Sequence, residues 1–165
     1  MRDGILQLAK LLLLALLIGG GSLAVKGTAR QVDFEKLQAD VEAAAEVSGL
    51  NQENAQLLRR FYGLNGGELV HWILYTAQDN MSVEELLLVE CSSESQAEQV
   101  LEAARERKAT QIKNFEGYGP EQVQLLNQSV LRSDGVYVLF AVSDQTAEIK
   151  KAYRKDLFQT DQTRI

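Results

Sequence analysis

VLRSDGVYVLFAV, at residues 130–142, is the stretch that decides the fold. Two runs of β-forming residues flank Asp134-Gly135. Asp-Gly is the strongest short signal for a β-hairpin, because a type I′ turn needs the positive φ that glycine adopts easily. The stretch therefore predicts two adjacent antiparallel strands.

Two earlier segments also have the composition of strands. Leu69–Thr76 is rich in aromatic and β-branched residues, and Leu86–Cys91 is a short apolar run. Asp79-Asn80 separates the two segments. Ser82 and Glu85 have the spacing of a capping box, so one helical turn is expected before the second of these strands.

Helical spacing of apolar residues predicts five helices around these strands. The expected helices are one from Asp33 to Ser48-Gly49, one with Asn51 as its N-cap, a long one from Ser93 to Phe115, a short one from Glu121 to Asn127, and a last one capped by Ser143-Asp144. Strand pairs separated by helices favour an α+β fold. The prediction is an antiparallel sheet of about four strands with helices packed on one face, preceded by an N-terminal transmembrane or signal helix.

The N-terminal segment from Ile5 to Val25 is interrupted only by Gln7 and Lys10. As a helix it would extend about 30 Å, roughly the hydrocarbon thickness of a bilayer. An uncleaved signal anchor, a cleaved signal peptide and a buried helix are all open, but a run without a polar face disfavours the buried helix. No cysteine stands directly after the run, which excludes a lipoprotein anchor.

These patterns divide the chain into three parts. Residues 1–29 are a membrane anchor or signal segment, residues 30–158 a single α+β domain, and residues 159–165 a flexible tail. The charged start before the apolar centre matches an export signal, which favours an N-terminus inside the cell. The prediction is a single-pass protein of the cell membrane, held there by residues 5–25, with its C-terminal domain outside the cytoplasm.

The charge of the expected domain is acidic. Residues 30–165 carry 14 basic and 22 acidic side chains, a net charge of −8. An acidic body repels phosphate backbones, so no nucleic-acid partner is expected.

The sequence has few of the residue types that catalysis and metal binding require. It contains one histidine, His71, and one cysteine, Cys91, and it has neither a nucleophile elbow nor a phosphate-binding loop. Zinc sites need more of these ligands. We therefore expect no enzyme, no cofactor and no metal. Cys91 ends an apolar run and is expected to be buried and inert, and His71 to be a packed or edge histidine.

The corner at residues 115–120, FEGYGP, is the most unusual segment. The long helix must end there, since glycine and proline are the poorest helix formers. Two interpretations remain open. In one, Tyr118 packs over a purely structural joint; in the other, the corner presents an exposed aromatic to a partner. The candidate partner-binding residues are Tyr118, Glu116 and Gln122.

Several segments together resemble a family of small bacterial domains of unknown function. The resemblance is carried by residues 85–89 (ELLLV), Arg107 with Gln111, residues 114–122 (NFEGYGPEQ), residues 134–139 (DGVYVL) and residues 142–144 (VSD). Its most specific element is Phe-x-x-Tyr-x-Pro-x-Gln at residues 115–122. The resemblance implies an exported domain held by a lipid or by an N-terminal membrane segment. It implies no activity.

Two functions follow as expectations. The first is a membrane-anchored extracytoplasmic interaction or accessory module, whose partner is an unidentified membrane or cell-envelope protein. The alternative is a small-ligand-binding or enzymatic domain that uses carboxylates such as Glu116 and Glu121. A pocket with converging polar groups would favour the alternative, and a flat surface patch the first.

Overall fold

The computed structural model describes residues 32–158. The predicted membrane or signal segment, 1–29, and the predicted tail, 159–165, both lie outside these residues. Among the helices between 32 and 158, none combines the length and the hydropathy needed to cross a bilayer.

One antiparallel sheet of five strands forms the centre of the molecule, with the strand order β1-β2-β3-β5-β4. The strands are β1 (Leu50–Gln52), β2 (His71–Ala77), β3 (Glu85–Glu90), β4 (Val130–Asp134) and β5 (Tyr137–Val142). The α+β class and the antiparallel sheet are confirmed. The expected number of about four strands is one too low, because β1 has only three residues and shows no alternation to read.

Five α-helices surround the sheet in the described part of the chain. They are α2 (Phe34–Ala45), α3 (Ala55–Tyr62), α4 (Glu94–Phe115), α5 (Pro120–Gln128) and α6 (Thr146–Phe158). Ser93 caps α4 as predicted, accepting a hydrogen bond from the backbone N–H of Gln96. Asn51 does not cap the second helix, because it lies in β1; Asn54 does so, with its side chain accepting from two backbone N–H groups.

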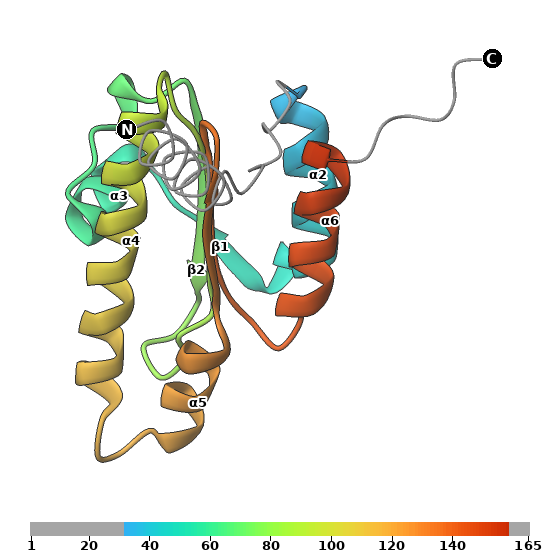
Figure 1. Ribbon diagram of the computed structural model, residues 1–165. Helices are drawn as coiled ribbons and strands as arrows, with labels where there is room; N and C mark the ends of the chain where they lie inside the picture. Colours follow the sequence, from blue (N-terminus) through green and yellow to red (C-terminus); the bar gives the residue numbers. More distant parts are fainter. Residues whose placement is uncertain (1–31, 159–165) are drawn as a thin grey trace, which may run out of the picture.

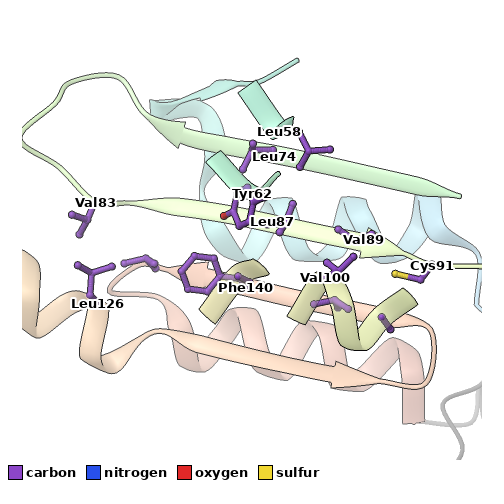
Figure 2. Packing of buried hydrophobic residues seen from close by; sticks show 14 of the residues in the cluster. Leu58, Tyr62, Leu74, Val83, Leu87, Val89, Cys91, Val100, Leu126 and Phe140 are labelled. Carbon is purple, nitrogen blue, oxygen red and sulfur yellow. The ribbon is translucent and has the colours of Figure 1, made fainter. Parts of the chain in front are cut away.

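The helices cover both faces of the sheet, and the expectation of helices on one face is wrong (Figure 1). α3, α4 and α5 pack on one face, and α2 and α6 on the other. The apolar run in β3 explains this arrangement: Leu87 and Val89 point to the first face, and Leu86 and Leu88 to the second. A strand without polar alternation is typical of a sheet buried on both sides. Figure 2 shows the core of the first face.

The predicted hairpin is present, but its turn is shifted by one residue. Asp134 pairs with Tyr137 in the ladder, so the two turn residues are Gly135 and Val136. Only Gly135 has a positive φ, of 59°. Positive φ at the first turn residue alone is the type II′ pattern, and not the expected type I′. The side chain of Asp134 forms an ion pair with Arg132 on the same strand.

Candidate functional site: a polar pocket at one end of the sheet

Three segments meet at the end of the sheet where β2 stops and β3 starts. They are the loop between β2 and β3, the C-terminal half of α4, and the corner that leads into α5 (Figure 1). Together with Phe61 of α3 they line a partly open pocket of about 470 Å³. Its lining side chains are mostly polar and come from Phe61, Thr76, Ala77, Asp79, Asn80, Ser82, Val83, Glu84, Glu85, Arg107, Gln111, Asn114, Phe115 and Tyr118.

A buried ion pair lies against the pocket. Glu85, the first residue of β3, is only 2% exposed, because its side chain shares the face of Leu87 and Val89 under α3 and α4. Arg107 of α4 donates to both of its carboxylate oxygens, through Nε at 3.2 and 3.1 Å and through Nη2 at 3.0 Å. Burial of a carboxylate is tolerated when such hydrogen bonds replace its water.

Tyr62 of α3 completes this cluster. Its hydroxyl donates to Glu85 Oε1 at 2.6 Å. Burial, together with the negative charge of Glu85, raises the pKa of the Tyr62 hydroxyl well above its ordinary value. Tyr62 is therefore a permanent hydrogen-bond donor at physiological pH. The cluster joins α3, α4 and β3 through a single carboxylate.

The guanidinium of Arg107 also contacts an aromatic ring. It lies over the ring of Phe61, 4.3 Å from the ring centroid. Within residues 32–158, no protein acceptor takes a hydrogen bond from its Nη1. The side chain is 13% exposed and lines the pocket. Arg107 thus lines the cavity with a guanidinium that is fixed by Glu85 and Phe61.

One wall of the pocket is a stripe along α4. Arg107, Gln111 and Asn114 lie one and two turns apart and share a face of the helix, and all three line the cavity. Tyr118 continues the stripe just beyond the end of the helix. The stripe supplies a guanidinium, two carboxamides and a phenol to the same space.

The opposite wall is the loop between β2 and β3. Asp79 folds this loop by accepting a hydrogen bond from the backbone N–H of Met81 at 2.7 Å. The helical turn predicted from Ser82 and Glu85 is absent, since Ser82 pairs with Glu84 and Glu85 belongs to the sheet. Gln122 of α5 accepts from the backbone N–H of Val83 at 3.1 Å. Gln122, a predicted partner-binding residue, therefore has a structural contact that ties α5 to the loop.

The corner between α4 and α5 turns where the sequence predicts. Gly117 has a φ of 93°, and Pro120 occupies the first turn of α5. Phe115 is buried, whereas Tyr118 is 61% exposed, with the two rings 5.4 Å apart. Of the predicted partner-binding residues, only Tyr118 reaches the pocket; Glu116 is exposed and lies outside its lining.

The chain matches the model of one protein family, described as Domain of unknown function (DUF4358), over residues 43–143. The chain belongs to this family. None of the curated proteins and none of the solved structures matches it. The match confirms a domain of unknown function, as the resemblance implied; bacterial origin, export and anchoring stay predictions. Every residue that lines the pocket lies within the DUF4358 match.

The sole histidine and cysteine of this DUF4358 chain lie at the opposite end of the sheet. His71 is exposed, stacks on Phe34 at 5.1 Å, and has its Nδ1 2.8 Å from a carboxylate oxygen of Glu90. Cys91 is buried as predicted, and burial raises its pKa to about 11, so its thiol stays protonated at neutral pH. Among residues 32–158, no three His, Cys, Asp or Glu side chains are grouped to hold a metal ion.

Proposed function

We propose that this chain is a membrane-anchored extracytoplasmic interaction module, without enzymatic activity, that binds its ligand or partner in the end pocket. The observation that carries the proposal is the position of the pocket at the end of the sheet farthest from where the chain enters it. Anchoring by residues 5–25 would then place the pocket on the side away from the membrane.

The entry point is fixed by contacts at the other end of the sheet. The backbone N–H of Val32 donates to the hydroxyl of Tyr137 at 3.1 Å, and Phe34 stacks on His71 at the start of β2. β2 then runs from His71 to Ala77, next to the pocket. Six steps along a strand cover about 20 Å. The pocket is therefore separated from the entry point by the full length of the central strands.

The polar lining supports binding more than carboxylate catalysis. Glu85 already accepts hydrogen bonds from Tyr62 and Arg107, which positions it as a structural group. Glu116 and Glu121, the carboxylates of the enzymatic alternative, are both exposed and lie outside the pocket lining. The pocket is concave with polar side chains in its lining, which favours the small-ligand half of that alternative. We therefore expect the partner to offer a compact group to the pocket.

Cell fractionation tests the location. We expect the full chain to sediment with membranes, and a chain that lacks residues 1–29 to be folded and soluble, because the apolar run lies entirely in the deleted part. Circular dichroism of the shortened chain serves as the control for folding. A full chain found in the cytosol, or a shortened chain that still sediments with membranes, would remove the anchor from the proposal.

Binding is tested separately, by photo-crosslinking from position 118 in intact cells. Tyr118 is the exposed aromatic at the pocket, and Val70, 48% exposed, is an apolar control position at the opposite end of β2. We expect an adduct from position 118 and none from position 70.

A further inference from the structure

We infer that the end pocket binds a neutral polyhydroxylated ligand, a saccharide. The inference rests on the proposed function, because it takes the end pocket as the binding site. It adds the chemical class of the ligand, which follows from the charge, the hydrogen-bonding groups and the exposed ring that the pocket presents.

The charge of the lining disfavours an anionic ligand. Three acidic residues, Asp79, Glu84 and Glu85, line the pocket together with one basic residue, Arg107. A phosphate or another anion would be repelled by this excess of negative charge. Part of this negative charge is already neutralised, because the carboxylate of Glu85 is paired with the guanidinium of Arg107. A neutral ligand avoids this penalty.

The hydrogen-bonding groups match hydroxyls. A hydroxyl both donates and accepts hydrogen bonds. It is therefore best satisfied between one group that accepts a hydrogen bond and another that donates one. Asp79 and Glu84 are acceptors on one wall, while Arg107, Gln111 and Asn114 supply donors on the other. A ligand with several neighbouring hydroxyls can bridge the two walls at more than one point.

The remaining features are size and the ring of Tyr118. A cavity of about 470 Å³ lies within the range of about 300 to 1,000 Å³ typical of small-molecule sites, and it has room for a monosaccharide or disaccharide. Tyr118 lies at the pocket with its ring exposed and backed by Phe115. Such a ring provides an apolar surface for the C–H face of a sugar.

Titration of the full chain with defined probes tests the ligand class. The chain is kept in a detergent without a sugar headgroup, and binding is measured by calorimetry and by ligand-observed NMR. The neutral probes are cellotetraose, maltotetraose and chitotetraose; spermidine and inorganic phosphate are the charged probes. We expect at least one neutral oligosaccharide to bind and both ions to fail. Tyr118→Ala and Asn114→Ala should each weaken the binding by about tenfold or more, and Val70→Ala should leave it unchanged.

The other outcomes overturn the ligand class and leave the proposed function to be judged separately. If spermidine or phosphate binds in a Tyr118-dependent way and no oligosaccharide does, the pocket is a binding site for an ion and the saccharide inference is wrong. If no probe binds, the inference is also wrong. In either case, an adduct from position 118 in cells would still support a binding role for the pocket, and its absence would remove that role too.

Discussion

Replacing Arg107 with methionine should lower the free energy of unfolding by about 3 to 5 kcal/mol, because it leaves the carboxylate of Glu85 buried without its charged partner. Methionine keeps the length and apolar contacts of the side chain, so the loss reports mainly the charge. Urea unfolding followed by the fluorescence of Trp72, the only tryptophan, gives the measurement.

The matched control lies two residues away on the same helix. Arg105 pairs with Glu102 at 2.8 Å, but both side chains are more than half exposed. Arg105→Met should therefore cost no more than about 1 kcal/mol. A second control converts the buried charge to a neutral amide: Glu85→Gln combined with Arg107→Met should be more stable than Arg107→Met alone. Equal losses from the two arginine variants would contradict the assignment of Glu85 and Arg107 as a buried pair.

Phe115→Ala should destabilise the domain by about 3 to 5 kcal/mol, since it empties a filled position of the core. Gly119→Val should also destabilise it, by about 1 to 3 kcal/mol, because a Cβ at residue 119 would lie 2.7 Å from Cδ1 of Phe115. Thermal unfolding of the variants checks both expectations.

Tyr118→Ala provides the contrast at the same corner. Its ring is 61% exposed, so the substitution should change the free energy of unfolding by no more than about 1 kcal/mol. If Tyr118→Ala unfolds the domain as severely as Phe115→Ala, then Tyr118 is a structural lock, and the pocket loses its exposed aromatic as a binding residue.

Local patterns in the sequence predict most of the elements but not how they pack. The spacing of apolar residues locates α4, and Asp134-Gly135 locates the hairpin, because both signals depend on neighbours in the chain. β1 has too few residues to form a pattern. The apolar run at residues 86–89 predicts a strand, and its lack of polar alternation accounts for the helices on both faces of the sheet.

The candidate site was predicted only in part, for a similar reason. The corner at residues 115–120 stands out in the sequence because glycine and proline have local consequences, and Tyr118 is exposed there as one interpretation expected. The pairing of Glu85 with Arg107 depends on the register of β3 and on the rotation of α4 above it. Neither can be read from a single sequence, so the local spacing of Ser82 and Glu85 predicts a helix cap in place of the buried ion pair.

Photo-crosslinking in intact cells tests the binding role of the end pocket most directly. Benzoylphenylalanine replaces Tyr118 in one full-length chain and Val70 in another, and intact-mass spectrometry measures the adduct on each. In two further chains that carry the crosslinker at position 118, Gln111→Trp fills the pocket, while Lys113→Trp adds the same ring to the exposed side of α4. We expect an adduct from position 118 alone, lost with Gln111→Trp and kept with Lys113→Trp. Equal yields from positions 118 and 70, or a yield from 118 that Gln111→Trp does not reduce, would contradict the assignment of the pocket as the binding site.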